Sequence, residues 1–197
     1  MFAFLSKKIA LPKNPLVFAV AWNQSDGCIC LGGENGLLKI LKMAEYKIGE
    51  KPKKALSQNI SLDGHQGNVT VIQWNEEYNK LTTSDADGLI IVWMLHDNQW
   101  YEEMINNRKK SSVSDIKWST DGAKVCIIYE DGAVIIGSVD GSREWGKELP
   151  HSLSKVEWSP DNKLLIFATQ EGDARVYSYL GNPMHKIKIY CFQDIDI

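Results

Sequence analysis

The chain has 197 residues, 44% of them hydrophobic and 24% charged, which is the composition of an ordinary globular protein. A formal net charge of −3 excludes the strongly basic surface that attracts nucleic-acid backbones, so no nucleic-acid partner is expected. The composition indicates neither disorder nor a transmembrane segment.

The amino-terminal segment, 1–11, reads as a strand over Phe2 to Leu11 that ends at Pro12. Its short apolar start is followed by Lys7 and Lys8 rather than preceded by basic residues, which is the reverse of a secretory signal. The sequence therefore predicts a chain that stays in the cytosol.

A Trp followed 14 residues later by a Gly occurs four times along the chain. Successive tryptophans of this series lie 52, 44 and 40 residues apart, which brackets the period of the four-stranded units of β-propellers. The sequence predicts an all-β chain made of four such blades, over 12–62, 63–106, 107–149 and 150–192. The repeat-defining pairs are Trp22 and Gly36, Trp74 and Gly88, Trp118 and Gly132, and Trp158 and Gly172.

The first blade is the least regular. Strands are expected over Cys28 to Leu31 and Leu37 to Leu41, on either side of a turn at 34–36. The outer hairpin carries an insertion from Met43 to about Leu56 with both lysines and glutamates. Mixed charge in an inserted loop is more typical of a solvent-exposed surface loop than of a membrane or nucleic-acid contact.

The second blade is the most regular, with β-branched, alternating runs separated by polar turns. Gly88 closes the turn 85–88 and supplies the positive φ that a tight hairpin needs. The four strands are predicted over 68–74, 80–84, 89–95 and 100–105.

The third and fourth blades repeat this plan. Their central strands are apolar at successive rather than alternate positions, which is typical of a sheet covered on both faces. We expect neighbouring blades to provide that cover. The strands are predicted over 124–129, 133–136, 143–149, 164–168, 174–177 and 185–190.

The predicted strands number one more than four complete blades need. The amino-terminal strand has no place in a self-contained four-bladed ring, so the sequence predicts the front part of a larger propeller, most often seven-bladed, or a truncated gene product. In either case the outer faces of the first and fourth blades would expose apolar surface, which marks an interaction site or an aggregation liability.

Blade 2 resembles the WD-repeat family. Gly64-His65, the turn residue Asp87 and Trp93 match its signature. The resemblance implies a buried hydrogen-bonded chain of His65, Thr83, Asp87 and Trp93, which supports the blade only when each member is satisfied. The other blades have Leu41, Gly137 and Tyr177 at the position of Trp93, and these blades are expected to be held by packing instead.

A closer resemblance extends over nearly the whole chain. It is similar to the amino-terminal propeller in a family of intraflagellar transport complex A subunits, at 4–10, 81–85, 88–95, 102–108, 129–134 and 137–141. The resemblance implies a non-enzymatic scaffold that supports retrograde ciliary transport and cilium assembly and helps membrane-protein cargo to enter cilia. It also implies other complex A subunits, ciliary cargo and adaptors as partners, and a location at the cilium and basal body with a cytoplasmic pool.

An enzyme is the first alternative. Phosphate-binding glycine motifs and nucleophile motifs are missing, and the carboxylate pairs Asp85/Asp87 and Glu130/Asp131 are explained as turn formers. The four histidines lack a metal-ligand spacing, so no catalytic residue, metal or cofactor is predicted. Cys28, Cys30, Cys126 and Cys191 are interpreted as buried reduced thiols.

A different binding role is the second alternative. A propeller related to the tubby-like family suggests the substrate receptor of a ubiquitin ligase, although no adaptor-docking segment stands outside the blades. An unrelated WD-repeat platform is also compatible with the repeat pattern, since this fold carries many functions.

Overall fold

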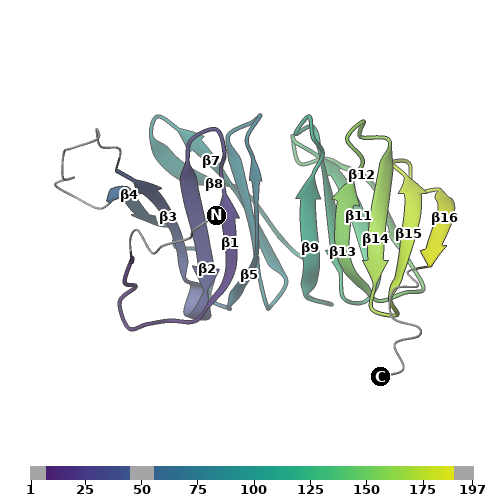
Figure 1. The fold of residues 1–197 in the computed structure, drawn as a ribbon, viewed down its shortest axis with the longest axis horizontal. Helices are drawn as coiled ribbons and strands as arrows, with labels where there is room; N and C mark the ends of the chain where they lie inside the picture. The colour runs from purple at the N-terminus through teal and green to yellow at the C-terminus, as the bar shows by residue number, and fades with distance from the viewer. Residues whose placement is uncertain (1–7, 45–55, 189–197) are drawn as a thin grey trace, which may run out of the picture.

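The computed structural model describes residues 8–44 and 56–188. Its sixteen strands form four antiparallel sheets of four strands each, and the order of strands within each sheet follows the order of the chain (Figure 1). The fold is therefore all-β, as the repeat predicts. The strands of sheets one and two are β1 Val17–Trp22, β2 Cys28–Gly33, β3 Leu38–Met43, β4 Leu56–Ser61, β5 Val69–Asn75, β6 Lys80–Asp85, β7 Leu89–His96 and β8 Gln99–Asn107. Those of sheets three and four are β9 Val113–Trp118, β10 Lys124–Tyr129, β11 Ala133–Ser138, β12 Arg143–Glu148, β13 Leu153–Trp158, β14 Leu164–Thr169, β15 Asp173–Ser178 and β16 Pro183–Lys188.

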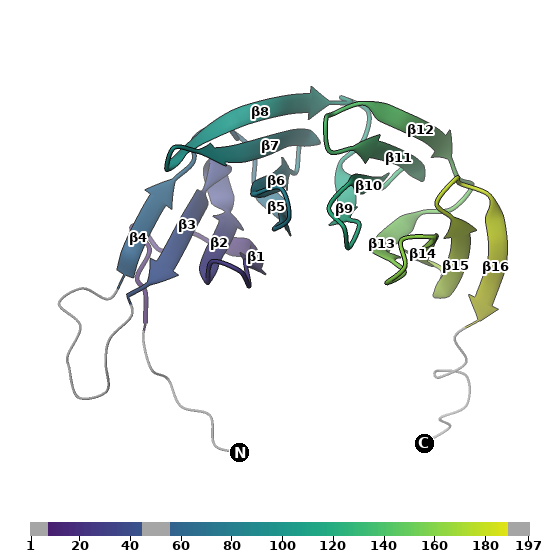
Figure 2. The same ribbon diagram turned by 90° about the horizontal axis from the view of Figure 1, so that it is seen from above.

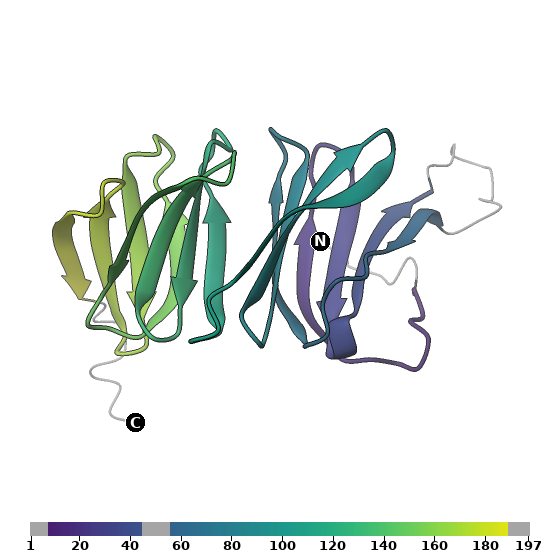
Figure 3. The same cartoon turned by 180° about the vertical axis from the view of Figure 1, so that it is seen from behind.

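The four sheets stand side by side as blades of an arc. Seen from above, β1, β5, β9 and β13 line the concave side, and β4, β8, β12 and β16 form the convex side (Figure 2). The view from behind shows the same succession of upright sheets (Figure 3). Each sheet lies within its predicted blade range, except that β8 extends by one residue to Asn107.

The glycine of each repeat closes the turn between the second and third strand of its blade. Gly36, Gly88, Gly132 and Gly172 have φ values of 73°, 80°, 85° and 83°. Only a residue without a Cβ adopts this region freely, and this explains why Gly recurs at a fixed distance from Trp.

The core lies between the blades rather than within a single sheet. Each of three apolar clusters joins side chains of two consecutive blades: the first joins blades 1 and 2, the second blades 2 and 3, and the third blades 3 and 4. The central strands are therefore covered on both faces, and β6 is buried at every position. This is the physical reason for the continuous apolar runs in the sequence.

Three of the four cysteines fall in this core. Cys28, Cys30 and Cys126 are buried and free, which agrees with the interpretation as small hydrophobic residues. Cys191 lies outside the described residues.

The predicted amino-terminal strand is wrong where it can be checked. Residues 8–11 are not in a strand, and residues 1–7 lie outside the described part. A run of residues with β propensity becomes a strand only when it pairs with a sheet edge, and none of the four described sheets takes residues 8–11 as a fifth strand. The insertion predicted between the last two strands of blade 1 also falls largely outside, since β3 ends at Met43 and β4 begins at Leu56.

Candidate interaction surfaces

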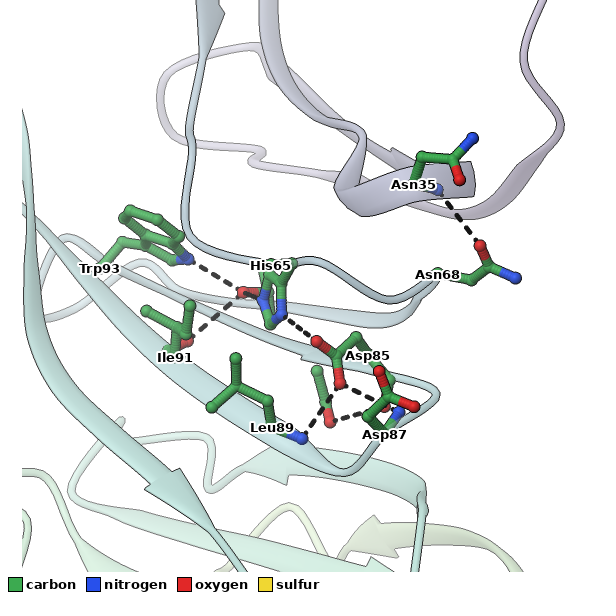
Figure 4. A network of polar contacts seen from close by, with 10 residues as sticks. Asn35, His65, Asn68, Asp85, Asp87, Leu89, Ile91 and Trp93 are labelled. Carbon is green, nitrogen blue, oxygen red and sulfur yellow. Dashed lines mark hydrogen bonds and ion pairs between the residues drawn. The ribbon is translucent and has the colours of Figure 1, made fainter.

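A buried hydrogen-bonded chain runs through blade 2 (Figure 4). The Trp93 indole N–H donates to Thr83 Oγ1 at 2.9 Å, and Thr83 Oγ1 lies 2.8 Å from His65 Nε2. His65 Nδ1 lies 2.8 Å from a carboxylate oxygen of Asp85. The second oxygen of that carboxylate accepts the backbone N–H groups of Asp87 and Leu89, both at 3.1 Å. A neutral His65 with its proton on Nδ1 satisfies every polar atom of the chain.

The carboxylate of this chain belongs to Asp85, and the prediction of Asp87 is wrong. Thr83 and Asp85 are two residues apart on β6, so both side chains point to the face on which His65 lies. Asp87 is exposed in the following turn and takes part only through its backbone N–H. The sequence contains a signal for Asp85: it lies two residues after Thr83 in the same strand, so the two side chains share a face. This signal is more reliable than the position of Asp87 in the turn of a repeat motif.

The other blades replace this polar chain by packing. Leu81 lies opposite Trp93 in blade 2, and Leu165 lies opposite Tyr177 in blade 4. The blade 4 equivalent of Thr83 is Phe167, whose ring meets that of Tyr177 edge-on at 5.4 Å between centroids. Blade 4 therefore fills with an aromatic pair the space that blade 2 fills with a hydroxyl and an indole.

The repeated tryptophans join each blade to the blade before it. The Trp74 indole N–H donates to Ala21 O at 3.2 Å, and the Trp158 indole N–H donates to Lys117 O at 3.0 Å. Ala21 and Lys117 each immediately precede the repeated Trp of the previous blade. The Trp118 indole N–H donates to Thr82 Oγ1 at 3.0 Å, and Thr82 pairs across the sheet with the residue that precedes Trp74. All three indoles thus reach the same place on the neighbouring blade.

The loops after the inner strands add further bonds between consecutive blades. Glu76 accepts the backbone N–H groups of Gln24 at 2.8 Å and Ser25 at 3.0 Å. The Asn75 side-chain amide donates to Gly122 O at 2.8 Å, and the Thr120 N–H donates to the Asn162 side chain at 2.9 Å. None of these contacts is suggested by the repeat letters, because the residues differ from one blade to the next.

Trp22 is the exception among the repeated tryptophans. Its side chain is 65% exposed, and among the described residues its indole N–H has no acceptor. Val17 and Val20 on the same strand are 39% and 64% exposed, although their equivalents Val69 and Ile72 are buried. We call Val17, Val20 and Trp22 the blade 1 face.

The far side of blade 4 is also open. Leu164 and Ile166 on β14 are 37% and 38% exposed, whereas Cys28 and Cys30, at the equivalent positions of blade 1, are buried by blade 2. The arc therefore has two apolar ends, each of the kind that the interior blades cover with a neighbour.

Within 8–44 and 56–188, no group of three or more His, Cys, Asp or Glu side chains is arranged to hold a metal ion. In the same ranges no helix has the length and hydropathy to cross a bilayer.

Comparisons with known proteins agree with this architecture. A family model described as "WDR35/TULP4 N-terminal" matches residues 1–196. WD repeat-containing protein 35 from Homo sapiens is 51% identical over 99% of the chain, and the rat protein of the same name is 50% identical. Human Tubby-related protein 4 is 38% identical over 67% of the chain.

Solved structures show the fold alone. A crystal structure of the mitotic checkpoint complex superimposes with a TM-score of 0.71 at 19% identity, over 90% of this chain and 52% of that chain. The carboxy-terminal WD40 domain of Sif2 gives a TM-score of 0.70 at 20% identity, over 93% of this chain and 49% of that chain.

The relatives are much longer than this chain. It spans 17% of the length of human WD repeat-containing protein 35 and 9% of that of Tubby-related protein 4. The match over residues 1–196 and the identity of 51% nevertheless establish the family. The chain belongs to the WDR35/TULP4 amino-terminal β-propeller family, a family of WD-repeat scaffolds.

Proposed function

We propose that the chain is a non-enzymatic scaffold subunit of the intraflagellar transport A particle. In this role it supports retrograde ciliary transport and cilium assembly, and it helps membrane-protein cargo to enter cilia. The observation that carries the proposal is the 51% identity to WD repeat-containing protein 35 over 99% of the chain.

The blade 1 face supports a role in assembly. In blade 2 the equivalent of Val20, Ile72, is buried and the equivalent of Trp22, Trp74, is partly buried, both in the cluster shared with blade 1, so the blade 1 face has the apolar character of a surface that receives another protein. We propose that subunits of the particle, cargo and adaptors are the partners, and that the protein acts at the cilium and basal body and has a cytoplasmic pool.

A substrate receptor of a ubiquitin ligase is the second candidate, favoured by the 38% identity to Tubby-related protein 4. Purification of the tagged chain from ciliated cells separates the two functions. The scaffold role predicts that intraflagellar transport A subunits co-purify and that a Val20→Asp/Trp22→Asp variant loses them. Recovery of a cullin adaptor without those subunits would support the receptor role instead.

A further inference from the structure

A cleft of about 660 Å³ separates the outer halves of blades 2 and 3. A volume of this size is typical of sites that enclose a ligand or a side chain of a partner. Apolar side chains of both blades form part of the lining: Ile90, Val92 and Met104 from blade 2, and Val125, Ile127 and Ile135 from blade 3.

The cleft exists because blade 3 lacks an aromatic residue. Val125 lies opposite Gly137, at the position where blades 2 and 4 have Trp93 and Tyr177. Trp93 belongs to the cluster shared by blades 1 and 2, and Tyr177 to the one shared by blades 3 and 4. Both are at most 9% exposed. Gly137 brings no side chain to the same place, and it lines the cleft.

Three polar bridges between the blades hold the cleft in shape. Trp118 closes it toward the inner strands through its bond to Thr82 at 3.0 Å. At one rim Lys80 Nζ donates to Val139 O at 2.8 Å. At the other rim Arg108, which follows β8, donates to Asp131 of blade 3 with a closest distance of 2.7 Å. The space is thus part of the folded chain and does not require a rearrangement to form.

The mouth of the cleft is cationic although the chain as a whole carries a net charge of −3. Four basic residues and one acidic residue line it: Arg108, Lys110, Arg143, Lys147 and Glu148. The Lys147 ammonium donates to Gly181 O of blade 4 and is therefore not one of the cations available to a ligand. Arg108 is occupied by Asp131 and Glu148. Lys110 and Arg143 are exposed and have no ionic partner in the described part of the chain.

Arg143 is positioned by a second glycine. A Cβ at Gly146 would collide with the Arg143 guanidinium, so this guanidinium lies against the bare backbone of β12 beside the cleft. A planar cation in this position offers two parallel N–H groups to a carboxylate.

We propose that this cleft binds a peptide segment of a partner protein, which inserts an aromatic side chain beside Gly137 and carries carboxylates on both sides of it. The ring takes the place that Trp93 and Tyr177 occupy in their own blades. Lys110 and Arg143 bind the flanking carboxylates. The cleft is separate from the blade 1 face, so a failure of peptide binding would leave the scaffold role untouched.

Fluorescence anisotropy on the full 197-residue chain tests the proposal. The probes are labelled octapeptides with a central Trp between Asp and Glu residues, the same peptide with a central Ser, and one with a central Trp between Lys residues. The acidic Trp peptide is expected to bind at least about tenfold more tightly than either of the others. Equal affinities, or no saturable binding by the acidic Trp peptide up to about 1 mM, would overturn the proposal.

Substitutions test whether the peptide binds in the cleft. Gly137→Tyr fills the cleft with the side chain that blade 4 already has, and it is expected to abolish binding while the far-ultraviolet circular dichroism stays unchanged. Lys110→Glu is expected to weaken binding by about tenfold. Lys109→Glu is the matched control, because this neighbouring lysine does not line the cleft and undergoes the same change of charge.

Two outcomes would contradict this location. One is an equal loss of affinity in Lys109→Glu and Lys110→Glu, which would indicate a diffuse electrostatic attraction. The other is binding of anionic phospholipid vesicles or single-stranded DNA that depends on Lys110 and Arg143 in the absence of selective binding of the Trp peptide, which would assign the cationic mouth to another class of ligand.

Discussion

The Trp158 indole donates to the carbonyl of Lys117, the residue that immediately precedes Trp118. The same relationship joins Trp74 to the residue that precedes Trp22. The Trp at the end of β5, β9 and β13 therefore does two things: it contributes apolar area to the interface between blades, and it fixes the height of one blade relative to the one before it. The spacing from Trp to Gly is constant because both lie in the inner part of one blade, whereas the distance between successive tryptophans also includes outer strands and loops of different length.

The hydrogen-bonded chain of blade 2 makes two neighbouring aspartates unequal. Asp85→Ala removes the partner of a buried His65 and two backbone N–H groups, so we expect a loss of about 2–3 kcal/mol in the free energy of unfolding. Asp87→Ala changes an exposed side chain and is expected to stay within about 0.5 kcal/mol of the wild type. Urea denaturation of both variants measures the difference. A larger loss of unfolding free energy for Asp87→Ala than for Asp85→Ala would contradict the assignment of Asp85 to the hydrogen-bonded chain.

His65→Ala tests the same hydrogen-bonded network at the residue that joins Asp85 to Thr83. The substitution removes one buried hydrogen-bond partner from the Asp85 carboxylate and one from the Thr83 hydroxyl, and the expected loss is again about 2–3 kcal/mol. The two losses should not add in a His65→Ala/Asp85→Ala double variant, because both substitutions break one network. Full additivity of the two losses would show that the residues act independently.

The bonds between blades give a pair of matched tryptophan substitutions. Trp158→Phe keeps a large apolar ring but removes the indole donor to Lys117 O, and about 1 kcal/mol of stability should be lost. Trp22→Phe removes an indole with no acceptor among the described residues from a side chain that is 65% exposed, so almost no change is expected. Thermal or urea unfolding distinguishes them, and a greater effect of Trp22→Phe would contradict the assignment.

The buried thiols make the free energy of unfolding depend on pH in the alkaline range. Burial raises the pKa of the Cys30 and Cys126 thiols above the ordinary value of 9.0. In the unfolded chain these thiols ionise near pH 9, whereas in the folded chain they keep their protons. Their contribution to stability is therefore complete below about pH 9 and is lost as the pH rises further.

Urea denaturation between about pH 7.5 and pH 10 measures this effect. We expect the free energy of unfolding to fall with a smaller slope in a Cys30→Ala/Cys126→Ala variant than in the wild type, whatever the variant's absolute stability. Equal slopes would show that the thiols ionise alike in the folded and unfolded chains. In the folded wild type, both thiols should also resist Ellman's reagent until urea is added.

The repeat made the fold predictable, because Trp and Gly mark points of each blade that physics constrains strongly. A Gly at positive φ and an indole that must find an acceptor tolerate few replacements, so β5 to β8 could be placed to within one or two residues. The prediction over Phe2 to Leu11 was wrong at 8–11, since β propensity does not reveal whether a sheet edge is available.

The candidate sites were less predictable than the fold. His65, Thr83 and Trp93 could be named from a motif, but Asp87 was chosen from the turn position, whereas the pleat of β6 selects Asp85. The cleft beside Gly137 could not be predicted, because the absence of a side chain at one position shows as a cleft only when the position of the neighbouring blade is known. Contacts such as Lys80 with Val139 O join residues far apart in the chain and leave no local signal.

The blade 1 face is an exposed apolar surface at a position that the interior blades cover with a neighbour. Sedimentation velocity of the purified chain, beside a Val20→Asp/Trp22→Asp variant, tests this most directly. We predict that the wild type is insoluble or oligomeric when expressed without partners and that the variant shifts toward a folded monomer. A wild type that sediments as a compact, monodisperse monomer, indistinguishable from the variant, would contradict the account.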